Sequence, residues 1–527
     1  MEDKQAELTV SCLRNIKQRN LKEAVRLCIE LNTTYPKNFE GWRLAGILHK
    51  NFSKPKAGLV STSKALELKP NNPEILIQRF HFLSQLQRID EAKKILSTLA
   101  SLRVTDSSTN SQIAMLFSSE EMHSEAIKKY EAAIFGDPSN YLLHFNLAVA
   151  YRFIGNLDNC ENSLNRCLKL NPKDSEAQSM RSSLKRQTIE SNHISELLEI
   201  SKDSRVTSAD KVGIYYALAK ELDDLNEFTK SFSYLKKASK IRKSKMQYDV
   251  QIDKNIMHKL IETFKTSSID DNTILKSNPT PIFILGLPRT GSTLLERILD
   301  CHSEIVSCGE LDHFGREIIT LCRETTRDKQ LSILELIELS RDINFDKLKS
   351  NYLEKAVSKN SDCRYFIDKL PLNFLYIAHI LQSFPNAKII RMKRHPMAFC
   401  FAIFKQNFRD IYPYSYDLKD IAKYYVSYEN LMNHWKDLFP NMIYELNYED
   451  LVKNTKAEIE KVCEFCDLAF ESNCLNFYKN KNPVTTASAA QVRQPIYTDS
   501  LDRWKNFEDY LQPFSSILTK NGIQIDR

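Results

Sequence analysis

The sequence has little glycine: 11 of 527 residues, against about 7 % in soluble proteins. Glycine supplies the positive-φ conformations of tight turns. Its scarcity therefore excludes a chain built mainly of short strands and hairpins, and also a collagen-like or linker-like chain. Long helices with short connections are favoured. Four of the glycines lie within 30 residues, which marks one segment that needs backbone freedom: Gly286, Gly291, Gly309 and Gly315.

Other features are also lacking. No apolar run approaches the ~20 residues of a membrane span, and the charged start, Met-Glu-Asp-Lys-Gln-Ala-Glu, does not resemble a secretory leader. The net charge of +7 is too small and dispersed to indicate a nucleic-acid partner. Twelve cysteines without a framework of spacings suit reduced thiols. We therefore predict a cytoplasmic protein with no membrane span and no nucleic-acid partner.

The first third of the chain contains an internal period of 34 residues. Prolines recur at intervals of 34 or twice 34, at Pro36, Pro70, Pro138 and Pro172. Twelve residues before each step of this ladder, including the step at Val104, the residue is small: Ala24, Gly58, Ala92, Ala126 and Cys160. Two antiparallel helices can cross closely at small residues, and a proline can end the second helix.

This pattern resembles the tetratricopeptide repeat, and Trp42, Gly46, Ala65 and Pro70 match it in place. The resemblance implies five repeats over about residues 5–174 and a surface that binds a protein or peptide. Self-association into a homo-oligomer is the alternative use. Helical periodicity continues over about 190–265, so residues 1–265 are predicted to form one helical array.

A polar linker, residues 266–281, precedes a different architecture, and we place the boundary near residue 275, with the second domain at 276–527. Residues 281–287 form an apolar run typical of a buried strand, and 292–299 have helical spacing. The strand-to-helix turn between them can cradle an anion. Ser292 stands where the Walker pattern requires lysine, while Arg289 lies inside the loop, which disfavours an ATP or GTP site.

The segment Pro288-Arg289-Thr290-Gly291-Ser292-Thr293 resembles the 5′-phosphosulfate loop of sulfotransferases. The donor of that family is 3′-phosphoadenosine 5′-phosphosulfate (PAPS). The resemblance implies that Arg289, Thr290, Gly291, Ser292 and Thr293 bind it. The predicted fold class is therefore α + α/β: a tetratricopeptide-repeat solenoid, then a P-loop-like three-layer α/β domain with a parallel sheet.

Two further elements resemble the tyrosylprotein branch of that family. Cys308-Gly309-Glu310 corresponds to its Cys-Gly-Glu, which implies that Glu310 is the catalytic glutamate. Asp368-Lys369-Leu-Pro resembles its Lys-Asp-Pro and implies that Lys369 contacts the transferring group. Arg394 matches the arginine that binds the 3′-phosphate. The serine expected eight residues later is Ala402, a loss that weakens donor affinity without abolishing it.

The last part of the chain extends the resemblance to residues 281–510. Tyr448, in Asn-Tyr-Glu-Asp-Leu, is implied to contact the donor. The segment 486–495, followed by Arg503-Trp504, resembles the closing segment of sulfotransferases that carry tetratricopeptide repeats. By that resemblance Ser488 faces the phosphosulfate and Arg503 offers a positive charge to the nucleotide.

We therefore predict a PAPS-dependent sulfotransferase whose acceptor is favoured to be a tyrosine of a protein or peptide presented by the repeats. A small-molecule or glycan acceptor, an interaction protein with a degenerate transferase domain, and a nucleotide kinase or NTPase remain as alternatives. Glu310 would take the acceptor proton, with His302 or His313 as substitutes, and Arg289, Lys369 and Ser488 would stabilise the leaving phosphate. Because cationic side chains supply this charge and no cluster has metal-ligand spacing, no metal is expected.

Overall fold

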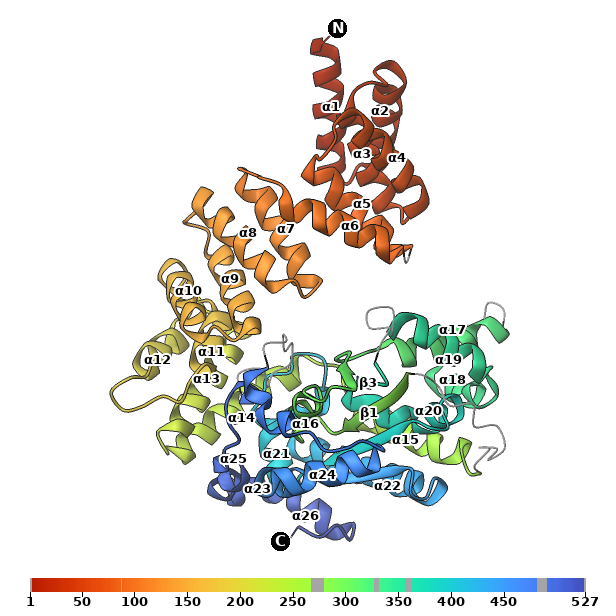
Figure 1. The fold of residues 1–527 in the computed structure, drawn as a ribbon. Coiled ribbons are helices and arrows are strands. Elements are labelled where there is room, and N and C mark those ends of the chain that lie inside the picture. The colour runs from red at the N-terminus through yellow and green to blue at the C-terminus, as the bar shows by residue number, and fades with distance from the viewer. Residues whose placement is uncertain are drawn as a thin grey trace. The chain divides into compact units, whose positions relative to one another are not determined.

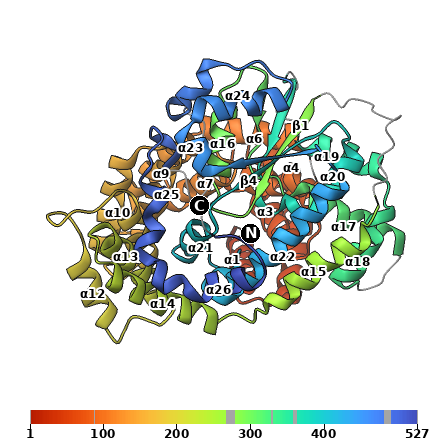
Figure 2. The same cartoon turned by 90° about the horizontal axis from the view of Figure 1, so that it is seen from below.

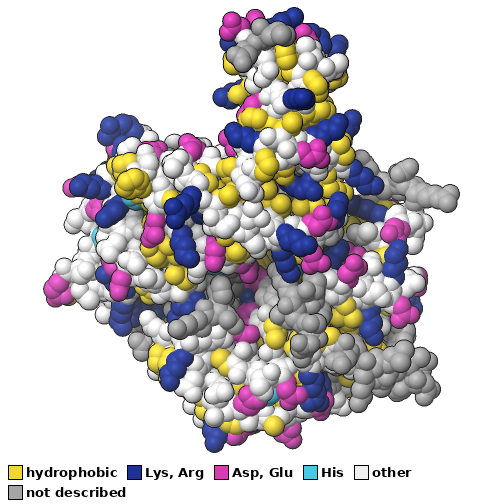
Figure 3. Space-filling model, turned by 45° about the horizontal axis from the view of Figure 1, so that its top comes forward, with side chains coloured by type: hydrophobic (Ala, Val, Ile, Leu, Met, Phe, Trp, Pro, Cys, Tyr) yellow, Lys and Arg dark blue, Asp and Glu magenta, His cyan; other side chains and the backbone are white. Residues whose placement is uncertain are grey.

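The computed structural model describes residues 2–86, 88–266, 279–326, 331–356, 363–480 and 491–525. It divides into two compact units, Met1–Pro172 (unit 1) and Lys173–Arg527 (unit 2). In these ranges, no helix is both long enough and apolar enough to cross a membrane. On the face drawn in Figure 3, Lys and Arg side chains are interspersed with Asp and Glu, as the small net charge of +7 predicts.

Unit 1 is a succession of helices that pack in consecutive pairs, which confirms the predicted helical repeat (Figure 1). The pairs are α1 (Glu2–Lys17) with α2 (Leu21–Thr34), α3 (Phe39–Asn51) with α4 (Pro55–Leu68), α5 (Pro73–Gln85) with α6 (Ile89–Ser101), α7 (Ser107–Ser119) with α8 (His123–Gly136), and α9 (Tyr141–Ile154) with α10 (Leu157–Leu170).

Capping residues begin the first helix of successive pairs at the same 34-residue interval. Each has a side-chain oxygen that accepts a hydrogen bond from a backbone N–H of the first turn, which the helix itself cannot satisfy. They are Asn38, Asn72, Asp106, Asn140 and, at the start of α11 (Ser175–Ser183), Asp174. The capping residues at the helix starts therefore recur with the same 34-residue period as the prolines.

The small residues of the repeat lie where helices cross. Ala24, Ala126 and Cys160 have no exposed surface. A Cβ added at Gly58 would lie 2.3 Å from Cζ of Phe82, so a larger residue there would separate α4 from α5. This close approach is the physical reason for the small residues in the period.

Unit 2 contains a five-stranded parallel sheet in the order β2-β3-β1-β4-β5. The strands are β1 (Thr280–Gly286), β2 (Ile305–Ser307), β3 (Tyr365–Asp368), β4 (Lys388–Lys393) and β5 (Ile443–Asn447). Its helices after β1 are α16 (Ser292–Leu299), α17 (His313–Thr326), α18 (Ile333–Leu339), α19 (Phe345–Ala356), α20 (Ile377–Ser383), α21 (Pro396–Phe404), α22 (Leu418–Leu438), α23 (Tyr448–Lys453), α24 (Thr455–Phe465), α25 (Asp499–Asp502) and α26 (Gln512–Lys520).

Helices cover both faces of the sheet, which confirms the predicted three-layer fold (Figure 2). Successive residues of a strand point to opposite faces. Ile282 and Ile284 of β1 accordingly belong to the core with α16 and α24, whereas Phe283 and Leu285 belong to the core with α17, α19, α20 and α22. The continuous apolar run of β1 is buried on both sides for this reason.

The helical extension packs with the α/β domain. It consists of α11, α12 (Ile194–Lys202), α13 (Asp210–Asp224), α14 (Phe228–Ser244) and α15 (Val250–Thr263). These helices belong to unit 2, and α15 packs against α22 and α18. The two compact units therefore meet after Pro172. The sequence-based domains, residues 1–265 and 276–527, were defined by the change from helical repeats to an α/β pattern, and they stay a prediction.

Candidate active site

The loop after β1 lies at the centre of the site. β1 has β3 on one side and β4 on the other, and the carboxyl end of such a strand is where ligands bind in open α/β sheets. Residues 287–291 turn the chain directly into α16. Arg289 has φ +67° and Gly291 has φ +99°. The first backbone N–H groups of a helix have no carbonyl partner of the preceding turn, and a helix start of this kind attracts anions.

Gly291 has both the backbone conformation and the close contact that exclude a larger residue. A Cβ at this position would lie 2.4 Å from Cδ2 of Tyr448. We expect Gly291→Ala to destabilise the protein by about 2 kcal/mol or more, since steric overlap adds to the cost of a positive φ. The matched control is Gly522→Ala, where φ is +73° with nothing within 4 Å of the added Cβ. That variant should lose about 1 kcal/mol. Equal melting temperatures of the two variants would contradict the role of the Tyr448 contact.

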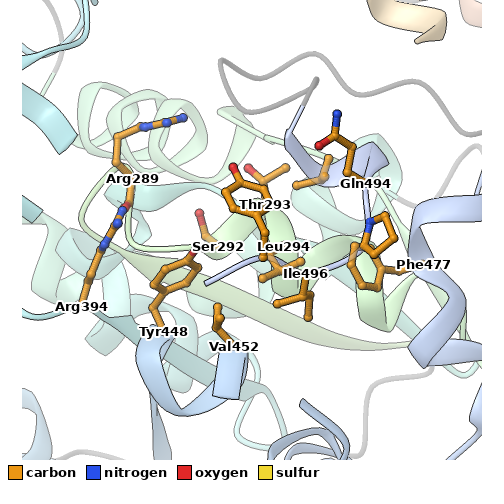
Figure 4. A pocket seen from close by; sticks show the side chains of 14 residues that line it. Arg289, Ser292, Thr293, Leu294, Arg394, Tyr448, Val452, Phe477, Gln494 and Ile496 are labelled. Carbon is orange, nitrogen blue, oxygen red and sulfur yellow. The ribbon is translucent and has the colours of Figure 1, made fainter. Parts of the chain in front are cut away.

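A pocket opens beside this loop, and residues of the loop, of the start of α16, of α23 and of the segment 492–497 line it. Figure 4 shows Arg289 and Arg394 at one end, Ser292, Thr293, Tyr448 and Ile496 between, and Phe477 and Gln494 at the other end. One end of the pocket is therefore cationic, and the other has an aromatic ring and a neutral amide. This arrangement suits a ligand with anionic groups and a flat apolar part.

Arg394 ties the elements around the pocket together. Its Nη1 donates to the backbone oxygen of Arg289 at 2.9 Å, and its Nη2 to that of Ser500 at 3.0 Å. The guanidinium lies over the ring of Tyr448, 4.7 Å from its centroid, and the Tyr448 hydroxyl is 3.1 Å from Oγ of Ser500. Burial lowers the pKa of Arg394. A dianionic ligand group would relieve part of this desolvation cost.

A second cluster surrounds Lys369, at the carboxyl end of β3. Its side chain is only 1 % exposed, and its Nζ forms an ion pair with Glu310 and lies 3.5 Å from Oε2 of Glu296. Burial acts to lower the pKa of Lys369, but the two carboxylates outweigh it and the net pKa is raised. Lys369 is therefore a cation held between a buried acid and a half-exposed one, since the Glu310 side chain is 44 % exposed.

Backbone pairing brings Glu310 to Lys369. The N–H of Cys308 donates to the oxygen of Ile367, and the N–H of Lys369 donates to the oxygen of Gly309, both at 2.9 Å. These bonds continue the β2–β3 pairing beyond the strand ends. Glu296 comes from α16, one helical turn after Ser292, so α16 joins the pocket to this second cluster.

Asp368, the last residue of β3, is a fully buried acid. Burial raises its pKa to about 7, against the opposing effect of the Tyr352 hydroxyl, which donates to its Oδ2 at 2.7 Å. A raised acid pKa contributes stability below about pH 4, and this is lost as the pH rises to about 7. Between pH 5 and 8 the wild type should lose about 3 kcal/mol of unfolding free energy that Asp368→Asn does not lose. The difference between the urea midpoints of the two proteins should change accordingly over this pH range. Parallel pH profiles would contradict this.

The structure places the other predicted residues as follows. The Thr290 hydroxyl donates to the oxygen of Leu287 at 2.7 Å and braces the loop. Among the described residues, Arg503 does not line the pocket, and its side chain instead donates to Asp223 and Asn226. Ala402 is buried in α21. Ser488 lies outside the described residues, so its role stays a prediction.

The two histidines considered as substitute bases differ. His302 is buried, and its Nε2 is 2.8 Å from the oxygen of Ala469. His313 begins α17 beside Asp312, with 3.4 Å between Nδ1 and Oδ1. Glu296 was not among the predicted site residues, although it lies four residues after Ser292 on a predicted helix.

Comparison with known proteins agrees with these observations. Residues 281–472 match the family model described as "Sulfotransferase family", and residues 142–174 and 212–245 match "Tetratricopeptide repeat". The predicted resemblance is thereby confirmed: residues 281–472 are similar to the sulfotransferase family, and two helical segments before them are similar to tetratricopeptide repeats.

Several relatives resemble part of the chain. An uncharacterized protein of Aquifex aeolicus (strain VF5) is 34 % identical over 319 residues, 59 % of this chain and 42 % of that protein. Protein-tyrosine sulfotransferase A of Caenorhabditis elegans is 24 % identical over 249 residues, 45 % of this chain and 64 % of that protein. The protein-tyrosine sulfotransferase of Drosophila melanogaster is 23 % identical over 235 residues, 42 % of this chain and 46 % of that protein. The chain thus spans about half the length of these curated relatives.

Two solved structures align with part of the chain. The sulfotransferase domain from the curacin biosynthetic pathway aligns with a TM-score of 0.33 and 22 % identity, covering 47 % of this chain and all of that one. YrrB, a tetratricopeptide-repeat protein with an unusual peptide-binding site, aligns with a TM-score of 0.27 and 18 % identity, covering 33 % of this chain and 90 % of that one.

Proposed function

We propose that this protein is a sulfotransferase that moves a sulfuryl group from PAPS to a hydroxyl acceptor. The observation that carries the proposal is the loop of residues 287–291, which ends a central parallel strand, begins a helix and opens on a pocket with two arginines. An anionic donor needs this concentration of positive charge and helix-start N–H groups. The sulfotransferase-family match over residues 281–472 supports the same conclusion.

The pocket fits the donor chemically. PAPS has a 3′-phosphate, a 5′-phosphosulfate and an adenine ring. Arg394 and Arg289 can meet the anionic groups, with the hydroxyls of Ser292 and Thr293 as hydrogen-bond donors. Phe477 and Ile496 can cover the flat base. Ala402 offers no hydroxyl to the 3′-phosphate, so Arg394 carries that contact.

The proposed reaction is one in-line transfer. The acceptor oxygen forms a bond to the donor sulfur while the bond from sulfur to the 5′-phosphate oxygen breaks. Glu310 accepts the acceptor proton, and 3′-phosphoadenosine 5′-phosphate leaves. Negative charge develops on the leaving phosphate, and Lys369, Arg289 and Ser488 are the proposed stabilisers. Since cationic side chains serve this purpose, the reaction is expected to need no added divalent ion.

A tyrosine of a protein or peptide is the acceptor we propose. The relatives named protein-tyrosine sulfotransferase support this choice. Unit 1 supplies a second support, a groove over α8, α9 and α10 that contains Phe135, 92 % exposed, and the amide side chains of Asn159 and Asn162. Exposed aromatic and amide groups are suited to bind an extended peptide. A small-molecule or glycan acceptor is the second candidate, and cytoplasmic location and self-association stay predictions.

The test has two stages. The purified chain should bind adenosine 3′,5′-bisphosphate, the desulfated product of the donor, in calorimetry. It should then transfer the sulfuryl group of PAPS labelled with radioactive sulfur to one member of a panel of tyrosine peptides, simple phenols and sugars, in the presence of a chelator. Failure to bind the bisphosphate would contradict the enzyme and favour an interaction protein. Transfer to sugars or phenols alone would contradict the tyrosine acceptor.

A further inference from the structure

The hairpin of α13 and α14 matches the tetratricopeptide-repeat model over residues 212–245 but packs on the transferase elements of unit 2. Phe232 of α14 stacks on Tyr510 and Phe404, with ring centroids 4.6 Å and 5.6 Å away. Arg242 binds Asp410 at 2.9 Å, and Lys243 binds Asp417 at 2.7 Å. This face of the hairpin is thus covered by the chain's own transferase elements.

Asp223 lies at the end of α13, and its buried carboxylate contacts two cationic side chains that follow the sheet strand β4 in the sequence, Lys405 and Arg503. Its Oδ1 accepts from Nε of Arg503 at 2.9 Å, and its Oδ2 lies 3.7 Å from Nζ of Lys405. Arg503 also donates to the backbone oxygen of Asp223 and, at 3.3 Å, to Oδ1 of Asn226. Its guanidinium lies over the ring of Phe228, 5.2 Å from the centroid. Arg503 is therefore held by four contacts, of which only one depends on the charge of Asp223.

These cations belong to the same electrostatic environment as the pocket. Arg289, Arg394 and Arg503 act electrostatically on Lys405, whose side chain is 37 % exposed, and the carboxylate of Asp223 opposes them. Arg289 and Arg394 line the pocket. Ser500, whose oxygen binds Arg394, precedes Arg503 by three residues on the same segment. Lys405 is thus coupled both to the two arginines of the pocket and to Arg503, and Asp223 is the counter-charge supplied by the repeat-like hairpin.

We propose that Asp223 sets the affinity of the donor site for nucleotides with a 3′-phosphate by neutralising part of the charge of Arg503 and Lys405. The hairpin is then a component of the nucleotide site. The inference rests on the proposed function, because it assumes an anionic donor in this pocket. Arg503 would keep three of its contacts in an isosteric Asp223→Asn variant, so its position should survive and the charge effect should dominate.

The test compares three proteins by calorimetry with adenosine 3′,5′-bisphosphate and with adenosine 5′-monophosphate. Asp223→Asn should bind the bisphosphate about 3- to 10-fold more tightly than the wild type, with a smaller gain for the monophosphate. The control is Glu227→Gln, which removes one negative charge from the same hairpin at a half-exposed residue paired with Lys230. Its affinity should stay within about twofold, since an exposed charge is screened.

A second pair of variants tests the charge balance. Lys405→Gln should weaken bisphosphate binding about 3- to 10-fold, and the Asp223→Asn/Lys405→Gln double variant should return close to the wild type. Unchanged or weaker binding by Asp223→Asn, with an unchanged melting temperature, would overturn the inference while leaving the proposed function intact. No bisphosphate binding by the wild type would overturn the proposed function and the inference with it.

Discussion

Glu310→Gln is expected to lower the turnover number by about 100- to 10,000-fold, the usual contribution of a general base. Glu310 is the half-exposed member of the Lys369 cluster, and its carboxylate can reach an acceptor that enters from solvent. It does not line the described pocket, so affinity for adenosine 3′,5′-bisphosphate should stay within about twofold. Single-turnover transfer from labelled PAPS measures the first quantity and calorimetry measures the second.

A matched control lies six residues earlier in the chain. Glu304 is also partly exposed and also forms an ion pair, with Arg364 at 3.0 Å. Glu304→Gln removes a comparable surface charge and should leave turnover unchanged. Equal turnover in Glu310→Gln and the wild type would contradict the assignment. The search for a base would then pass to His313, because the ring of His302 is buried against the oxygen of Ala469.

The helical repeat and the α/β domain could be predicted because each leaves a local signal. Prolines and small residues recur every 34 residues because every pair repeats the same close crossing. The apolar run of β1 followed by Gly286 and Gly291 indicated a buried strand and an anion loop. The matching cap residues Asn38 to Asp174 carry the same period, and the structure shows their function at the helix starts.

Contacts between distant segments could not be predicted in this way. The pairing of Arg503 with Asp223 joins residues 280 positions apart, and no spacing rule connects an arginine after the last motif to the end of a repeat-like helix. The role of Glu296 could not be predicted for another reason. A glutamate on a helix is usually solvated, and only the tertiary fold places this one beside Lys369, at the end of β3.

Lys369→Met is expected to reduce turnover by about 1,000-fold, since it removes the buried cation that we propose stabilises the leaving phosphate. The same change leaves Glu296 buried without its cation, with the Ser307 hydroxyl donating to it at 2.7 Å. Burial already raises the pKa of Glu296. The single variant should therefore also lose about 3 kcal/mol of stability, which confounds the loss of activity.

The Glu296→Gln/Lys369→Met double variant separates these effects. It replaces the buried ion pair by two neutral side chains of similar size, a change that is often neutral for stability. The melting temperature should return close to that of the wild type, because no unpaired buried charge remains. Turnover should stay about 1,000-fold reduced, because the cation beside Glu310 is still missing. Recovery of activity together with stability would show that Lys369 serves the fold and not the transfer.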